Sequence, residues 1–356
     1  MKRSYEWVIR EYGHHIAAGD GYILGADIGG TNSNFGIFDL VDHKPRLILS
    51  LHTKSQHIDD FTQVIVELLG IINESYHIKI KHSCFAAAGV PSEDRQRCKP
   101  TNLTFVVDIQ DIRSKTGLDC IYLANDFEVI GYGLEVIDPS AIVSVNNGVA
   151  RHSANKAIIG AGTGLGKAIL RWDEHYQHYM PVVSEGGHAD FPPQTTQELQ
   201  FTELVKRKEG LHCNVSWEHV LSGYGIGRIY QYFLSINSGI PQAKQLAVNG
   251  PHPDEIFASR NLDDHAHNTY RWYSRFYARC AKNFALESLS LGGVYIAGGI
   301  AAKNLDLFKQ EEFMQAFTDC GKQQDLLKNI PISVITDYNV SLYGAAYYLV
   351  LEGICG

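Results

Sequence analysis

Acidic, amide and hydroxyl side chains stand beside paired glycines near the start of this chain, in the stretch YILGADIGGTNSNFGIFDL (22–40). The apolar run Tyr22–Leu24 leads to Asp27, and a second apolar run, Phe35–Phe38, follows the glycines. Strand, Gly-Gly turn and strand predict a β-hairpin. Glycines let backbone N–H groups approach a phosphate closely, and a carboxylate beside them suits a Mg²⁺ ion. An ordinary hairpin with a solvated Asp27 is the simpler alternative.

The strand-to-glycine pattern occurs at two further places. KAIIGAGTGLGKAIL (156–170) has an apolar run, a glycine loop and a second apolar run. VYIAGGI (294–300) is a strand-like run that ends in a Gly-Gly turn, with a helix expected over 301–308. This spacing indicates two similar halves that face a shared cleft, each with a phosphate loop.

These glycine loops do not fit the common nucleotide-binding templates. A P-loop that ends in Gly166-Lys167 requires Gly at position 161 and Ser or Thr at position 168, and both positions are Ala. A dinucleotide fingerprint that begins at Gly160 requires Gly at position 165, which is Leu. The H-R-D and D-F-G sequences of protein kinases do not occur. The sequence therefore excludes these three classes.

Strand-like and helical patterns alternate around the loops and indicate an α/β layer structure. Besides the hairpins, we expect helices over 59–72 and 127–134 and strands over 84–90, 104–108 and 121–124. Residues 1–21 form an N-terminal extension, in which the pattern suggests a helix over 5–16.

Composition limits the function classes further. A chain of 356 residues is long enough for two domains with substantial cores. The net charge of −8 and the lack of a basic stripe argue against a nucleic-acid partner. No apolar run reaches transmembrane or signal-peptide length, so we expect no membrane partner and a cytoplasmic location. Seven scattered cysteines with no C-x-x-C pair predict free thiols.

Six stretches together resemble a known group of proteins. Three resemble the two phosphate motifs and the adenosine motif of the actin-like sugar kinase superfamily: DIGGTNSNFGIF (27–38), GAGTGLGKAIL (160–170) and GGVYIAGGI (292–300). Three more resemble the sugar-site signatures of the bacterial glucokinase family: LANDFEVIGYG (123–133), SEGGHADFPP (184–193) and WEHVLSGYGIGRIY (217–230). The resemblance runs from about residue 22 to the C-terminus, with the motifs in the expected order.

The resemblance implies a two-domain actin-like (ribonuclease H-like) α/β fold with a cleft between the domains. It implies a small domain over 22–136 plus 335–356 and a large domain over 137–334. The implied reaction transfers the γ-phosphoryl group of ATP to the 6-hydroxyl of D-glucose and gives glucose 6-phosphate and ADP. The implied cofactors are ATP and Mg²⁺, and the family suggests a homodimer.

The resemblance also assigns roles to residues. Asp126 would be the general base, at the end of a strand where a carboxylate can project into a cleft, although it could also be the N-cap of the following helix. The implied sugar-binding residues are Asn125, Asp126, Glu185, His188 and Glu218. The implied nucleotide contacts are Gly29, Gly30, Thr31, Asn32, Gly162, Thr163, Gly164, Gly298 and Gly299, with Asp27 on Mg²⁺.

Other functions stay open at this point. The E-x-x-H spacing of Glu185 and His188 also occurs in metal sites. A related hexose or N-acetylamino-sugar kinase would share most of the motifs. A sugar-sensing regulator would bind hexose without turnover, and a structural ATPase of the actin type would lack the sugar residues.

Overall fold

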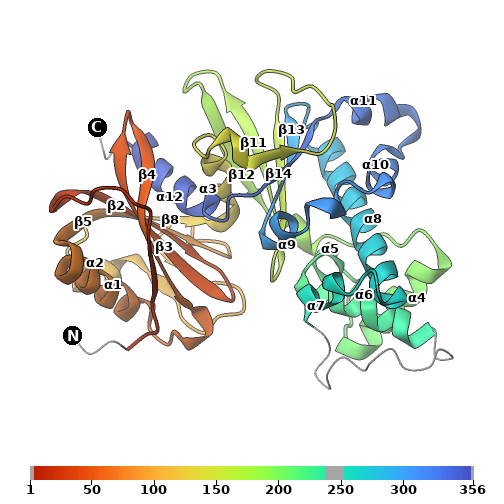
Figure 1. Ribbon diagram of the computed structural model, residues 1–356, viewed down its shortest axis with the longest axis horizontal. Helices are drawn as coiled ribbons and strands as arrows, with labels where there is room; N and C mark the ends of the chain where they lie inside the picture. The colour runs from red at the N-terminus through yellow and green to blue at the C-terminus, as the bar shows by residue number, and fades with distance from the viewer. Residues whose placement is uncertain (1–3, 237–251, 354–356) are drawn as a thin grey trace. The chain divides into compact units, whose positions relative to one another are not determined.

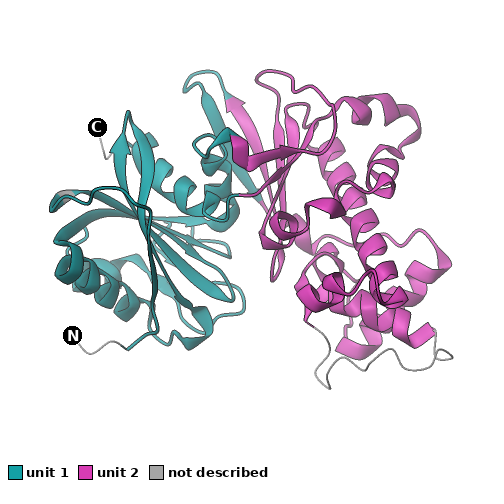
Figure 2. Cartoon of the chain, in the orientation of Figure 1, with its two compact units in different colours: residues 1–139, 173–183, 337–356 teal, residues 140–172, 184–336 magenta. Residues whose placement is uncertain are grey.

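The computed structural model describes residues 4–236 and 252–353, which form two compact units (Figures 1 and 2). Unit 1 comprises residues 1–139, 173–183 and 337–356, and unit 2 comprises residues 140–172 and 184–336. Residues 1–3 of the predicted N-terminal extension, residues 237–251 of the predicted large domain and residues 354–356 of the predicted small domain lie outside the described residues. Residues 173–183 group with unit 1, whereas the sequence-based boundaries put them in the large domain.

Unit 1 is built on a sheet that contains the predicted hairpin. Its strands are β1 (Val8–Glu11), β2 (Gly19–Ile28), β3 (Asn32–Val41), β4 (Lys44–Lys54), β5 (Ile78–Ala87) and β8 (Cys120–Asn125). Their order is β1-β4-β3-β2-β5-β8. β3 is antiparallel to β2, while β5 is parallel to β2 and β8 is parallel to β5. The carboxyl ends of β2, β5 and β8 therefore lie along one edge of the sheet.

Helices cover both faces of this sheet (Figure 1). On one face, α1 (Phe61–Tyr76) and α2 (Ile109–Lys115) share a core with Leu24 and Ala26 of β2. On the other face, α3 (Asp126–Gly133) and α12 (Val340–Leu351) pack with Ile23. This alternation is the period of two that a buried strand requires. A short ladder of β6 (Arg97–Cys98) and β7 (Val107–Asp108) and a 3-10 turn, Ser55–His57, complete the unit.

Glycines let α3 and α12 approach so closely that their backbones are in contact. A Cβ atom on Gly344 would lie 1.7 Å from the Val129 carbonyl oxygen, and one on Gly133 would lie 2.1 Å from the Val340 carbonyl oxygen. Real Cβ atoms do not come so close to backbone atoms, so only glycine fits at these two positions. The contact brings the start of α12 beside β2.

The helix expected over 5–16 is wrong, because this segment forms an edge strand. β1 pairs antiparallel with β4, with Val8 opposite His52. Trp7 and Ile9 pack against the core while Val8 is exposed, so the alternation of a strand prevails over helical propensity. Glu67 on α1 holds the start of the segment, since its carboxylate accepts the indole N–H of Trp7 at 2.8 Å.

Unit 2 repeats the strand order of unit 1. Its strands are β9 (Ile142–Ser144), β10 (Lys156–Ala161), β11 (Leu165–Asp173), β13 (Gly293–Ala297) and β14 (Ile332–Ile335), while β12 (His178–Ser184) lies mostly in the segment grouped with unit 1. β10 pairs antiparallel with β11 and parallel with β13, which pairs parallel with β14. A glycine hairpin followed by two parallel strands is therefore common to both units.

The core of unit 2 surrounds one long helix, α8 (Asp264–Glu287), whose Tyr273, Phe276 and Tyr277 are fully buried. The other helices are α4 (Thr196–Glu209), α5 (Trp217–Val220), α6 (Gly223–Ile236), α7 (Pro253–Ala258), α9 (Gly299–Lys303), α10 (Glu311–Thr318) and α11 (Gln324–Asn329). The helix expected over 301–308 is α9, which ends at Lys303 and is followed by a 3-10 turn, Leu305–Leu307.

The remaining predicted elements occur with shifted bounds. The helices expected over 59–72 and 127–134 are α1 and α3, and the strands expected over 84–90, 104–108 and 121–124 are β5, β7 and β8. Within residues 4–236 and 252–353, no helix combines the length and the apolar character needed to cross a bilayer. The described cysteines with free thiols are Cys84, Cys98, Cys120, Cys213, Cys280 and Cys320.

Candidate active site

The predicted phosphate turn of unit 1 connects β2 to β3 and is held in shape by Ser55. The backbone N–H of Gly29 donates to the Asn32 carbonyl oxygen at 3.1 Å. The Ser55 hydroxyl donates to the Gly29 carbonyl oxygen at 2.6 Å, and the Ser55 N–H donates to the Thr31 carbonyl oxygen at 3.1 Å. These bonds occupy the carbonyl oxygens of Gly29, Thr31 and Asn32. Ser55 directly follows β4 as the first residue of the 3-10 turn Ser55–His57, and no motif in the sequence marks it.

Asp27 lies at the carboxyl end of β2, half-buried, where it contacts α12. Its Oδ2 accepts a hydrogen bond from the Ser341 hydroxyl at 2.7 Å. Burial raises the pKa of the Asp27 carboxyl, while the bond from Ser341 lowers it. A carboxylate that is short of solvation gains from a nearby cation, and Mg²⁺ is commonly held by one or two carboxylates together with substrate phosphates. Asp27 beside the glycine turn fits that donor set.

Asn125 and Asp126 lie on the same sheet edge as Asp27. Ala87 on β5 pairs with Ile28 of β2 on one side and with Asn125 of β8 on the other. Asn125 is the N-cap of α3, and its side chain accepts the N–H groups of residues 127 and 128. Asp126 is the first residue of the helix, so the capping role that could have explained this carboxylate belongs to its neighbour.

A second hydrogen bond fixes the Asn125 amide to the loop that follows β5. Its Nδ2 donates to the Gly89 carbonyl oxygen at 2.9 Å. Glu128 completes a capping box by accepting the Asn125 backbone N–H, and Arg95 in turn donates to Glu128 Oε2 at 3.0 Å. The loop and the helix start therefore brace each other. Gly89, Arg95 and Glu128 were not identified from the sequence, although Asn-x-x-Glu before a helix is a recognisable capping signal.

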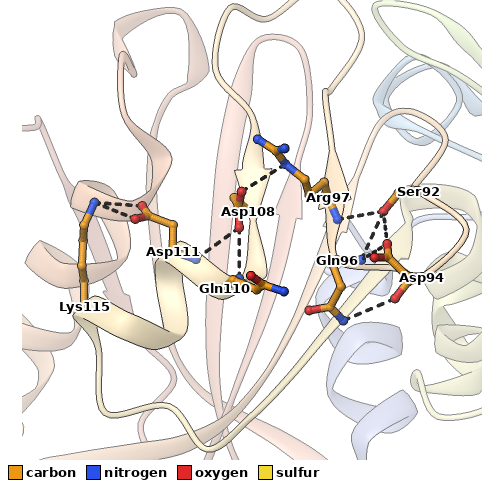
Figure 3. Close-up of polar contacts among 8 residues, drawn as sticks. All are labelled: Ser92, Asp94, Gln96, Arg97, Asp108, Gln110, Asp111 and Lys115. Atoms are coloured by element: carbon orange, nitrogen blue, oxygen red, sulfur yellow. Dashed lines mark hydrogen bonds and ion pairs between the residues drawn. The ribbon is translucent and has the colours of Figure 1, made fainter.

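A polar network keeps this bracing loop in place (Figure 3). The Ser92 hydroxyl donates to Asp94 Oδ1 at 2.6 Å and accepts the backbone N–H of Arg97 at 3.0 Å. The Arg97 side chain pairs with Asp108 at 3.0 Å, and Asp108 caps α2. The hydrogen bond from Ser92 holds the pKa of the Asp94 carboxyl below its usual range. The loop is thus tied to α2 as well as to the start of α3.

The charge of Asp126 acts on a buried thiol nearby. Burial, reinforced by the negative charge of Asp126, raises the pKa of Cys98 to about 11. Cys98 is buried in β6 and stays protonated at neutral pH. A buried thiol that stays protonated is a poor nucleophile.

Unit 2 brings the predicted sugar residues Glu185, His188 and Glu218 together. Glu185 directly precedes a 3-10 turn, Gly186–His188, of which His188 is the last residue, and Glu218 lies in the first turn of α5. His188 Nε2 lies 3.7 Å from Glu185 Oε2, and His188 Nδ1 lies 3.9 Å from Glu218 Oε1. The side chains of Glu185 and His188 are more than half exposed, so polar atoms of this cluster can reach a ligand.

The glycine loop of unit 2 lies against the same cluster. Glu218 Oε2 accepts the backbone N–H of Leu165 at 3.0 Å, and the Gly223 N–H donates to the Gly162 carbonyl oxygen at 2.9 Å. Thr163 is exposed at the tip of this loop. The Gly164 carbonyl oxygen accepts the Gly162 N–H at 2.9 Å, which closes the turn.

The predicted adenosine turn is adjacent to the same hairpin. Gly298 has φ +94°, and a Cβ atom there would lie 2.6 Å from the Ala161 carbonyl oxygen at the end of β10. Gly299 begins α9. The turn therefore requires glycine at position 298 both for its backbone angle and for its closeness to β10.

Glu218 is the third side chain beside Glu185 and His188, the pair whose spacing also occurs in metal sites. In the described part of the chain, no three His, Cys, Asp or Glu side chains gather into a group that could hold a metal ion. The predicted residues thus form two groups. Asp27, the turn 29–32, Asn125 and Asp126 lie in unit 1, and Glu185, His188, Glu218, the loop 162–164 and the turn 298–299 lie in unit 2.

Two α/β units of the same strand order, each with a glycine turn after its first hairpin strand, define an actin-like fold. Solved structures agree. A glucokinase from an Antarctic psychrotroph has a TM-score of 0.75 at 24% identity, covering 93% of this chain and 99% of that one. A glucokinase from Balamuthia mandrillaris in complex with glucose has a TM-score of 0.78 at 21% identity, covering 94% of each chain. A ROK family glucokinase from Streptomyces griseus in complex with glucose and AMPPNP has a TM-score of 0.60 at 16% identity, covering 92% of this chain and 98% of that one.

Sequence comparison identifies the family. The family model described as Glucokinase matches residues 24–352. A glucokinase of Nostoc punctiforme is 31% identical over 339 residues, which is 91% of this chain and 97% of the relative. A glucokinase of Yersinia pestis is 31% identical over 337 residues, 92% of this chain and 96% of the relative. The chain belongs to the glucokinase family.

Proposed function

We propose that this protein transfers the γ-phosphoryl group of ATP to the 6-hydroxyl of D-glucose and releases glucose 6-phosphate and ADP. The observation that carries the proposal is the gathering of Glu185, His188 and Glu218 beside a glycine loop. Hydroxyl-rich ligands are recognised by such groups of donors and acceptors, and glycine loops suit phosphates. The relatives named glucokinase support glucose as the acceptor, and the AMPPNP bound to a related structure supports an adenine nucleotide as the donor.

Asp126 is the proposed general base. As the sugar oxygen attacks the γ-phosphorus, its proton passes to the Asp126 carboxylate, a new O–P bond forms and the bond to the β-phosphate oxygen breaks. Positioned proton acceptance of this kind contributes roughly 10²–10⁴-fold to the rate. Its place at the start of α3, with Asn125 acting as the N-cap, supports this role because the carboxylate is not needed as the cap.

The proposed nucleotide contacts come from three turns. Gly29, Gly30, Thr31 and Asn32 would meet phosphates with backbone N–H groups and short polar side chains, as would Gly162, Thr163 and Gly164. Gly298 and Gly299 would let the adenosine lie against the backbone. Asp27 would hold Mg²⁺ directly or through water, and the bound ion would neutralise phosphate charge.

Asn125, Glu185, His188 and Glu218 are the proposed sugar ligands, together with Asp126. A sugar epimer with a displaced hydroxyl would leave one of these groups unpaired, which is the usual source of discrimination. The Asn125 amide is already held by Gly89, so only part of its hydrogen-bonding capacity is left for a ligand.

We also propose the domain assignment, the oligomeric state and the cellular location of the protein. Units 1 and 2 correspond to the small and large domains, with residues 1–21 as an N-terminal extension of the small domain. The resemblance to bacterial glucokinases favours a homodimer and a cytoplasmic location. Light scattering of the purified chain tests the dimer, since a single species at monomer mass across the micromolar range would contradict it.

The proposal is tested by a coupled assay for ADP release with ATP and Mg²⁺. The acceptors are glucose, mannose, N-acetylglucosamine and no sugar. We expect ADP release that requires glucose and is slower with the other sugars. Preference for N-acetylglucosamine or mannose would make the protein a related sugar kinase. Binding of glucose without turnover would make it a sensor, and ADP release without sugar would make it an ATPase.

A further inference from the structure

Glu218 contacts two parts of unit 2 with its two carboxylate oxygens. Oε2 accepts the backbone N–H of Leu165, on the glycine loop, at 3.0 Å. Oε1 lies on the side of His188, 3.9 Å from Nδ1, and the side chain is about one-third exposed at 31%. One carboxylate therefore joins the proposed sugar ligands to the proposed phosphate loop.

Two backbone contacts also join the glycine loop to the segments that carry the proposed sugar ligands. Gly223, just after α5, donates its N–H to the Gly162 carbonyl oxygen at 2.9 Å. Gly187, in the turn between Glu185 and His188, is so close to the loop that a Cβ atom would lie 1.9 Å from the Leu165 carbonyl oxygen. The glycine loop therefore has little room to move unless the proposed sugar ligands move with it.

We propose that Glu218 couples the two subsites, so that the position of the glycine loop sets the affinity for the sugar and the sugar in turn orders the loop. This inference rests on the proposed function. A carboxylate with one oxygen held by a backbone donor presents its other oxygen in a fixed direction, which lowers the entropy lost on binding a hydroxyl. Because coupling free energies are reciprocal, the sugar must stabilise the loop conformation by the same factor.

Two glycines of the same loop offer a matched pair of substitutions. A Cβ atom on Gly164 would lie 2.5 Å from Glu218 Oε2, whereas one on Gly162 would meet nothing within 4 Å. The atom in the way at Gly164 is the end of a flexible side chain, so Gly164→Ala should displace the Glu218 carboxylate while the fold persists. Gly162→Ala adds the same methyl group to the loop but leaves Glu218 in place.

The first measurement is the glucose dissociation constant by calorimetry, with no nucleotide present. We expect Gly164→Ala to weaken glucose binding roughly tenfold or more, the usual effect of losing a hydrogen bond to a charged group. Gly162→Ala alters a proposed phosphate contact but leaves Glu218 in place, so we expect it to weaken glucose binding several-fold less. Equal glucose affinity in the two variants, with wild-type melting temperatures, would overturn the coupling. If the wild type itself binds no glucose, the proposed function fails instead.

The second measurement tests whether Glu218 supports the glycine loop, through the affinity for AMPPNP with Mg²⁺ in the absence of sugar. Glu218→Ala removes the acceptor of the Leu165 N–H, and Glu185→Ala removes the same charge from a residue whose pairing is with His188. We expect Glu218→Ala to weaken AMPPNP binding about tenfold relative to Glu185→Ala. The same affinity in both variants would contradict the coupling, and this comparison holds whichever sugar the protein uses.

Discussion

At the scale of single residues, His219 occupies the third position of α5, where a capping box ordinarily has Glu or Gln. Its Nδ1 accepts the backbone N–H of Ser216 at 3.0 Å, so this nitrogen carries no proton. Burial and then the Arg228 guanidinium lower the pKa of His219, with His188 acting in the same direction and Glu209 and Glu218 opposing it. The neutral ring therefore stabilises the helix start next to Glu218.

This arrangement predicts a loss of stability in acid. The pKa of His219 is lower in the folded than in the unfolded chain, so its contribution is present above the unfolded value of 6.5 and is lost as the pH falls through the folded value. We expect the melting temperature to fall as the pH drops below about 6.5, and the KM for glucose to rise, less in His219→Gln than in the wild type. Gln keeps the capping box without titrating. Identical pH profiles in the wild type and His219→Gln would show that His219 does not contribute to the loss of stability in acid.

The proposed ligand residues stand in sequence motifs, whereas the residues that support them do not. Asp126, Glu185, His188 and Glu218 lie in motifs because the proposed chemistry requires their types and local spacing. Ser55 and Ser341 support the phosphate turn and Asp27 from other parts of the chain, and a lone serine in a turn or helix gives no local signal. Such contacts depend on tertiary packing, which periodicity does not specify.

At the scale of elements, α8 anchors the loop that follows the 3-10 turn Gly186–His188, which carries a proposed sugar ligand. Arg279 donates to Glu198 Oε2 at 2.8 Å and to the Pro192 carbonyl oxygen, and both charged side chains are almost fully buried. Glu198 also accepts the Gln194 N–H at 2.7 Å. The ion pair thus fixes the segment just after His188.

Breaking this buried pair should be costly. We expect Arg279→Met to lower the free energy of unfolding by about 1.5–3 kcal/mol and to raise the KM for glucose, because a buried hydrogen bond to a charged group is lost while Arg275 still pairs with Glu198 at 2.9 Å. Arg271→Met on the same helix breaks the partly exposed pair with Glu312 and should change stability by less than about 1 kcal/mol. Urea unfolding measures both. Similar losses in the two variants would show that the buried pair is not a special anchor.

The contact of α3 with α12 gives another prediction for an element. Gly344→Ala places a methyl group on the Val129 carbonyl oxygen, so α12 must move and carry Ser341 away from Asp27. We expect a loss of about 1–3 kcal/mol or more in the free energy of unfolding. Gly227→Ala in α6, where a Cβ atom meets nothing within 4 Å, should instead be neutral or stabilising by up to about 1 kcal/mol. Equal stability of the two variants in urea would contradict the close contact.

At the scale of the whole molecule, the sequence predicted two similar α/β halves because each glycine hairpin has its own apolar strands. The shared strand order of the two units bears this out. Residues 5–16 were misassigned because a short segment with several charged residues can be fitted to either period, and its pairing partner β4 lies some forty residues away, with Val8 opposite His52. The grouping of residues 173–183 with unit 1 likewise follows from contacts that local patterns do not contain.

The variant Asp126→Asn tests the proposed role of Asp126 as the base in glucose phosphorylation. Asn has nearly the same shape and can still hydrogen-bond a sugar hydroxyl, but it cannot accept the proton. We predict that glucose still binds, by calorimetry, while kcat for glucose-dependent ADP release falls by at least ~10²-fold. A variant with kcat within about tenfold of the wild type would show that Asp126 is not the base.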